Sequence, residues 1–155
     1  MVTQITARCC LNHQNADSMR VAPVSQTVRS QLLSVARRRT EPKGAVLFRR
    51  NEPAFGIFLI CKGSVGLRLE GKQGKSVWGR TATAHSIVGL PATLSGDRYS
   101  LTAVTLEKSD LAFVDRSALL ELIKGDTRVG LDLMRALGDE VVRMRGILAS
   151  KPSTS

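Results

Sequence analysis

Short apolar segments separated by turn residues fill the chain between positions 43 and 113, and this pattern restricts the fold more than any other feature. Residues 56–61 form an apolar run typical of a buried strand. Residues 64–69 alternate with a period of two, which places Val65, Leu67 and Leu69 on one face. Residues 71–74 then predict a hairpin turn. Strands at this spacing predict a mainly β fold with flanking helices, either a small barrel or a jelly-roll sandwich.

Helical patterns lie on both sides of this β-rich region. Apolar residues at helical spacing predict a helix over 24–38, with Ser25 as its N-cap. After the strands we expect a short helix over 118–123, followed by a long helix that ends near position 149 and is capped by Asp126 or Thr127. The predicted divisions are a disordered tail at 1–22, a single domain at 23–149 and a second tail at 150–155.

The overall composition is that of a globular protein. Of its 155 residues, 43% are apolar and 23% charged, and no apolar run is long enough to span a bilayer. The N-terminal segment has no apolar core of a secretory signal; its basic, acid-poor composition also suits a transit peptide, but we interpret it as a tail. Cys9, Cys10 and Cys61 are too few for an iron–sulfur cluster, which needs four thiolates. Unpaired cysteines indicate a reducing compartment, and we expect a cytoplasmic location.

Positive charge is concentrated in the first half of the sequence. The net charge is +10; residues 1–80 contain 14 Lys and Arg against 4 Asp and Glu, whereas residues 81–155 contain 9 of each. Arginines at 37–39 and 49–50 form two clusters in the basic half. Such a field favours nucleic acid or anionic ligands. The alternative is a solvated basic face, since the sequence contains no recognisable DNA-reading motif.

Residues 88–104 carry the most specific pattern, VGLPATLSGDRYSLTAV. They resemble the phosphate-binding cassette of cyclic-nucleotide-binding domains. Residues 43–48 (KGAVLF), 51–63 (NEPAFGIFLICKG) and 111–116 (LAFVDR) resemble further segments of the sensor domain of the CRP/FNR regulator superfamily, in the same order. The resemblance covers about 43–149. It implies a cup-shaped barrel, a ligand held between barrel and long helix, and dimerisation through that helix. A helix-turn-helix domain normally follows in the family, whereas this chain stops.

Two cassette positions differ from the family pattern. Leu90 stands where the family's Glu would hold the ribose, and Tyr99 where its Arg would pair with the cyclic phosphate. Backbone N–H groups after Gly89 can still hold an anion, and Arg98 could turn inward from a shifted loop. We therefore expect cAMP binding to be lost, leaving either a site for a less charged effector or a closed scaffold. The candidate ligand-binding residues are Gly89, Leu90, Pro91, Ala92, Arg98, Tyr99, Ser100 and Thr102.

The long C-terminal helix carries two apolar faces. Leu131, Leu133 and Ile147 could pack against the barrel, and a second stripe has the spacing of a coiled-coil seam. We expect a homodimer through this stripe, the alternative being an amphipathic helix that lies on its own domain. The candidate interface residues are Met134, Leu137, Val141, Met144 and Leu148.

No enzyme signature is found in the sequence. His13 lies in the tail and His85 in a polar turn, Asp97 and Asp115 lack the spacing of an acid–base pair, and no metal-ligand cluster is seen. We therefore expect a non-enzymatic regulatory domain of a CRP/FNR-type transcription regulator without a cofactor. The alternative is a nucleic-acid-binding protein that uses its basic half.

Overall fold

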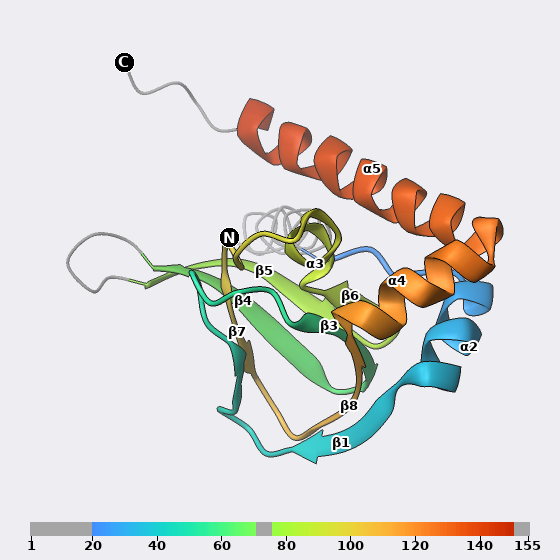
Figure 1. Cartoon of the computed structure of the whole chain (residues 1–155). Helices are drawn as coiled ribbons and strands as arrows, with labels where there is room; N and C mark the ends of the chain where they lie inside the picture. The colour runs from blue at the N-terminus through green and yellow to red at the C-terminus, as the bar shows by residue number, and fades with distance from the viewer. Residues whose placement is uncertain (1–19, 71–75, 151–155) are drawn as a thin grey trace, which may run out of the picture.

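The computed structural model describes residues 20–70 and 76–150, and for 143–150 only the course of the helix. It contains two four-stranded antiparallel sheets (Figure 1). The expected mainly β, jelly-roll type of fold is confirmed, although the strands form two separate sheets and not one closed barrel. The first sheet has the order β1(Arg37–Glu41), β8(Ser109–Asp115), β3(Gly56–Lys62), β6(Ile87–Val88), and the second the order β2(Val46–Phe48), β7(Thr102–Thr105), β4(Ser64–Glu70), β5(Ser76–Thr83).

Strand β3 lies between two hydrophobic cores. Its side chains alternate, so that Phe58 and Ile60 join the core between the sheets while Ile57 and Leu59 join the core under the helices. All four are buried. Burial on both faces explains why 56–61 is a continuous apolar run, as expected from the sequence.

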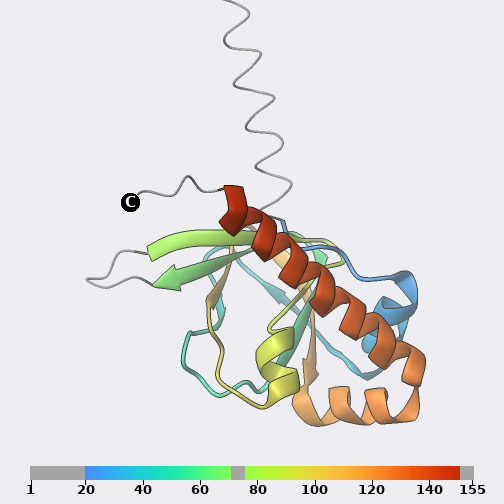
Figure 2. The same cartoon turned by 90° about the horizontal axis from the view of Figure 1, so that it is seen from above.

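Helices cover the outer face of the first sheet and one end of the molecule. Helix α2(Gln26–Val35) and the N-terminal part of α5(Thr127–Ser150) pack on this face with α4(Arg116–Gly125) (Figure 1). Helix α3(Leu90–Ser95) contacts β3 and α4 and lies to one side of α5 when the molecule is seen from above (Figure 2). The predicted N-cap is confirmed, since the Ser25 hydroxyl accepts a hydrogen bond from the Val28 N–H at 3.3 Å. The Asp126 carboxylate accepts one from the Arg128 N–H at 2.9 Å, at the start of α5.

Two local expectations are wrong. The helix predicted over 24–38 ends at Val35, because residues 37–41 pair with β8 as an edge strand. Tertiary pairing here outweighs the local helical pattern. Leu69 is exposed instead of sharing the buried face of Val65 and Leu67. The pairing of β4 with β7 ends at Arg68, so Leu69 extends past the core.

Residues 20–22, which the sequence places in the tail, lie along β5. The Val21 N–H donates to the Thr81 carbonyl at 3.0 Å, and the Val21 carbonyl accepts from the Ser86 hydroxyl at 3.0 Å. The remainder of the predicted tail with Cys9, Cys10 and His13, the turn at 71–74, and the final tail except Ser150 lie outside the described residues. No helix in the described part of the chain is long and apolar enough to cross a membrane.

Candidate functional site

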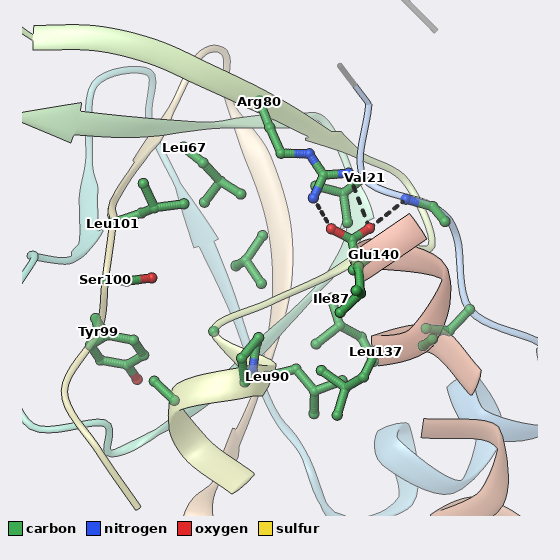
Figure 3. Close-up of a pocket in the computed structure, with 18 of the residues that line it drawn as sticks. Val21, Leu67, Arg80, Ile87, Leu90, Tyr99, Ser100, Leu101, Leu137 and Glu140 are labelled. Carbon is green, nitrogen blue, oxygen red and sulfur yellow. Dashed lines mark hydrogen bonds and ion pairs between the residues drawn. The ribbon is translucent and has the colours of Figure 1, made fainter. Parts of the chain in front are cut away.

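A cavity of about 590 Å³ lies between the cassette, the strands and the long helix α5 (Figure 3). Most of its lining is apolar, and it is built from four parts of the structure. The segment before α2 contributes Val21, Ala22 and Val24; the strands contribute Phe48, Leu67, Arg80, Ile87 and Val88; the cassette contributes Gly89, Leu90, Pro91, Ala92, Tyr99, Ser100 and Leu101; and α5 contributes Ala136, Leu137, Glu140 and Val141.

The cassette helix α3 begins at a left-handed glycine. Gly89 has a φ of +87°, and a Cβ atom at this position would lie 3.0 Å from Cε1 of Tyr99 and 3.2 Å from the Gly56 carbonyl oxygen. Glycine is therefore needed both for the backbone conformation and for the close approach of Tyr99. Pro91 occupies the first turn of the helix, as the sequence predicts. Leu90 is buried in the core under the helices.

Tyr99 fills the position where the family pattern has an arginine. Its ring is 2% exposed and stacks on Phe48, with 3.8 Å between the ring centroids. Its hydroxyl donates to the Gly56 carbonyl at 2.5 Å and accepts from the Gly56 N–H at 3.2 Å. Burial raises the pKa of Tyr99, an effect that its hydrogen bonds to the backbone oppose. The Tyr99 side chain is thus neutral, and its hydroxyl is hydrogen-bonded to the backbone of Gly56. It presents no positive charge to the cavity.

The remaining predicted cassette residues divide into two groups. Ser100 lines the cavity. Arg98 is exposed and outside the lining, and its Nη1 donates to the Asn51 carbonyl at 2.7 Å. Thr102 is also outside the lining: its buried Oγ1 accepts from the Arg50 N–H at 3.0 Å. The structure therefore gathers Gly89, Leu90, Pro91, Ala92, Tyr99 and Ser100 at the cavity and places Arg98 and Thr102 elsewhere.

An ion pair at one end of the cavity joins β5 to α5 (Figure 3). The two terminal guanidinium nitrogens of Arg80 face the carboxylate of Glu140, with Nη2 to Oε1 at 3.1 Å and Nη1 to Oε2 in contact. Arg80 Nη2 also donates to the Arg20 carbonyl at 3.1 Å, and the Ala22 N–H donates to Glu140 Oε1 at 3.4 Å. These two residues are the only charged ones among the described residues of the lining.

Sequence reasoning missed this pair. Arg80 and Glu140 are separated by 60 positions, and nothing local connects them. One signal was present: Glu140 follows Leu133 and Ala136 at spacings of three and four, which places a carboxylate on the inner face of the helix. A charged residue on a buried helical face normally has a partner.

Three of the five residues predicted for the helix interface have described side chains on α5. Met134 and Val141 are 66% and 51% exposed, whereas Leu137 is half-buried and lines the cavity. Leu133 packs inward as expected, but Leu131 is exposed on the outer side. The side chains of Met144, Ile147 and Leu148 lie outside the described residues. The outer stripe of α5 accordingly consists of Leu131, Met134 and Val142, and Val141 lies between this stripe and the cavity, which it also lines.

The two basic clusters are divided between the sheets. Arginines 37–39 lie on β1, where Arg39 pairs with Glu41 and Arg38 Nη1 donates to Cys61 Sγ at 3.3 Å. Arginines 49–50 follow β2 in the other sheet. The described part of the chain contains no group of three His, Cys, Asp or Glu side chains placed to hold a metal ion.

The family is established by sequence comparison. The model of the cyclic nucleotide-binding domain matches residues 38–126, more than half of the chain. The chain therefore belongs to the cyclic nucleotide-binding domain family, and the predicted resemblance to CRP/FNR-type sensor domains is confirmed at the level of the fold. No curated protein sequence matches it.

Similar solved structures include three regulators or parts of regulators. The catabolite activator protein of Thermus thermophilus is 22% identical with a TM-score of 0.72, over 81% of this chain and 59% of that protein. The c-di-GMP-responsive global regulator CLP of Xanthomonas campestris is 19% identical with a TM-score of 0.69, over 77% and 59%. The sensor domain of the transcriptional regulator DNR from Pseudomonas aeruginosa is 21% identical with a TM-score of 0.62, over 86% and 87%. The chain thus shares their fold and spans about three-fifths of the first two proteins.

Proposed function

We propose that this chain is a non-enzymatic sensor domain whose cavity binds a small, largely apolar effector in place of a cyclic nucleotide. The observation that carries the proposal is a cavity of about 590 Å³ at the cassette, lined by apolar residues where the family pattern places charged ones. A volume of this size is within the range of small-molecule sites. An open cavity favours an effector site over the alternative of a closed scaffold.

The contacts of the cassette argue against a cyclic nucleotide. Leu90 offers no acceptor to a ribose hydroxyl, and the Tyr99 hydroxyl is already bonded to Gly56. Arg98 is directed to the Asn51 carbonyl and not to the cavity. A cyclic phosphate placed among these apolar side chains would lose its hydration without gaining a charge-assisted partner from the cassette.

The arrangement of α5 supports a role in signalling. One face of the helix lines the cavity, and the outer stripe of α5 is exposed. Exposed apolar stripes of this kind usually mark an interaction surface. We propose that the stripe meets its counterpart in a two-fold homodimer, and that an effector changes how the two helices meet. DNR is a transcriptional regulator by name, and we propose that this chain serves a cytoplasmic regulator of that kind.

The experiment compares a neutral apolar probe with cAMP. N-phenyl-1-naphthylamine, whose fluorescence rises in apolar surroundings, is titrated into the full chain, and cAMP is titrated by calorimetry. We expect a saturable fluorescence increase and no cAMP binding in the micromolar range. Micromolar or tighter cAMP binding would contradict the proposal.

Two variants of α5 test whether the fluorescent probe binds in the cavity. Ala136 lines the cavity from α5, so Ala136→Phe should fill part of the space and abolish the saturable signal. Leu131→Phe adds an aromatic ring to the exposed side of the same helix and is the matched control. If both variants bind the probe as the unmodified chain does, the probe occupies another surface and the effector site is wrongly placed.

A further inference from the structure

We propose that the effector is an amphipathic carboxylic acid whose carboxylate replaces Glu140 on Arg80 and thereby releases α5 from the strands. This inference rests on the proposed function, because it assigns a chemical class to the effector of the same cavity. Arg80 stands at one end of the cavity, and the apolar lining extends from it past Ile87 and Leu137 to the cassette (Figure 3). The site therefore offers one point of charge recognition and a long apolar remainder.

The guanidinium of Arg80 already holds a carboxylate in the geometry that such a ligand would use. Two of its nitrogens face the two oxygens of Glu140, the paired arrangement that gives arginine its preference for carboxylates. The Arg80 side chain is 8% exposed and that of Glu140 is 24% exposed. Glu140 is thus the partner that can move into water, while Arg80 stays in the protein, where a ligand carboxylate can take the place of Glu140.

Charge balance selects a monocarboxylate among the ligands that could enter. A neutral ligand that displaced Glu140 would break this buried ion pair without supplying another carboxylate, which is costly. A ligand with two negative charges would bring one that the described lining cannot neutralise, since its only other charged group is the displaced glutamate. Exchange of one carboxylate for another keeps the net charge of the pocket unchanged.

Displacement of Glu140 by a ligand carboxylate would also change how α5 is held against the strands. Glu140 connects α5 to Arg80 on β5 and to the Ala22 N–H of the segment before α2. Among the described side chains of α5, which end at Val142, the fully buried ones are Val129 and Leu133, near the start of the helix. Loss of the Glu140 contacts would therefore free the part of α5 that follows Ala136 while its beginning stays packed. Local release of this kind occurs where few buried contacts remain.

The test measures the affinity ratio between decanoate and 1-decanol, which share a chain length and differ in the head group. Both are titrated calorimetrically into the full chain below their aggregation limits. We expect decanoate to bind about 10- to 100-fold more tightly than decanol, the range of a hydrogen bond to a charged group. Arg80→Gln should abolish this preference.

Glu140→Gln distinguishes competition from a structural role. Removal of the competing charge should raise the decanoate-to-decanol ratio further, whereas a glutamate that merely organised the site would lower it when replaced. Glu121→Gln, at a side chain that is 78% exposed on α4, is the control and should leave the ratio unchanged. Glu140 is partly exposed, so this variant is expected to fold even if Arg80→Gln does not.

Hydrogen exchange provides the readout for the helix. Decanoate should accelerate exchange of the α5 amides after Ala136 and leave those around Leu133 protected, and decanol should not. Equal affinities of decanoate and decanol, or a lower ratio in Glu140→Gln, would overturn the carboxylate assignment and leave the apolar effector standing. If neither compound nor N-phenyl-1-naphthylamine binds, the proposed function fails as well.

Discussion

The variant Tyr99→Phe removes a single oxygen atom and tests the hydrogen bonds that connect the cassette to β3. The Tyr99 hydroxyl is the acceptor for the Gly56 N–H at 3.2 Å and a donor to the Gly56 carbonyl at 2.5 Å. The aromatic ring stacked on Phe48 is retained in the variant, so the apolar contacts are unchanged. What is lost is a pair of buried hydrogen bonds between the cassette and the first residue of β3.

The size of the effect follows from which partners remain. The Gly56 carbonyl still has the Thr93 hydroxyl within reach at 2.9 Å, although the single proton of that hydroxyl is shared with the Gly89 carbonyl at 2.7 Å, whereas the Gly56 N–H loses this acceptor. A buried polar group left unsatisfied costs about 1–3 kcal/mol, and we expect a value in the lower half of that range. For a chain of this length, each kcal/mol corresponds to a fall in Tm of about 2–4 °C.

Urea denaturation of the unmodified chain, Tyr99→Phe, Thr93→Val and the double variant measures the effect. The Tyr99 hydroxyl and the proton that Thr93 shares between Gly56 and Gly89 can both serve the Gly56 carbonyl, so the double variant should lose more free energy of unfolding than the sum of the single variants. A cost for Tyr99→Phe below about 0.5 kcal/mol, the usual scale of surface substitutions, would refute the assigned hydrogen bonds.

Three further outcomes are expected. Because burial raises the pKa of Tyr99, its contribution to stability is complete below pH 10 and falls as pH rises from there through the folded-state pKa; Tyr99→Phe should lose this alkaline dependence, and tyrosinate absorbance reports it directly since Tyr99 is the only tyrosine. Met134→Glu with Val142→Glu should convert dimers to monomers by light scattering, while Asp139→Lys, on the same helix, should not; an unmodified chain that is monomeric at high micromolar concentration would contradict the interface. Retention on DNA should be weak and vanish at moderate salt, because the basic clusters are divided between two sheets; salt-resistant retention would support the nucleic-acid alternative.

The parts of the fold that the sequence predicts correctly depend on short-range patterns. The apolar run of β3, the cap at Ser25 and the glycine–proline start of α3 each depend on residues within a few positions. The helix predicted over 24–38 includes Arg37 and Arg38, whose strand partner, β8, lies about 70 positions further along the chain. Long-range pairing of this kind leaves no periodic signal near the residues concerned.

The candidate site likewise contains residues that a local motif predicts and contacts that only the folded chain creates. The cassette motif places Gly89 and Tyr99 at the cavity, but whether Arg98 points inward depends on the Asn51 carbonyl, which only the folded loop brings within 2.7 Å. The ion pair between Arg80 and Glu140 joins a strand to a helix across 60 positions. Its recognition requires the relative placement of β5 and α5, which sequence patterns do not supply.

The packing around Tyr99 also makes the present form of the cassette difficult to reverse. The ring lies against Phe48 and within 3.0 Å of the position that a Cβ of residue 89 would occupy. Replacement of Tyr99 by the arginine of the family pattern would bury a guanidinium in this aromatic setting, next to a cassette whose Leu90 supplies no carboxylate. An unpaired charge at such a depth costs several kcal/mol, a large fraction of the stability of a typical domain. A lineage that acquired this tyrosine would therefore have to change several neighbouring positions at once before a phosphate-binding arginine became tolerable again.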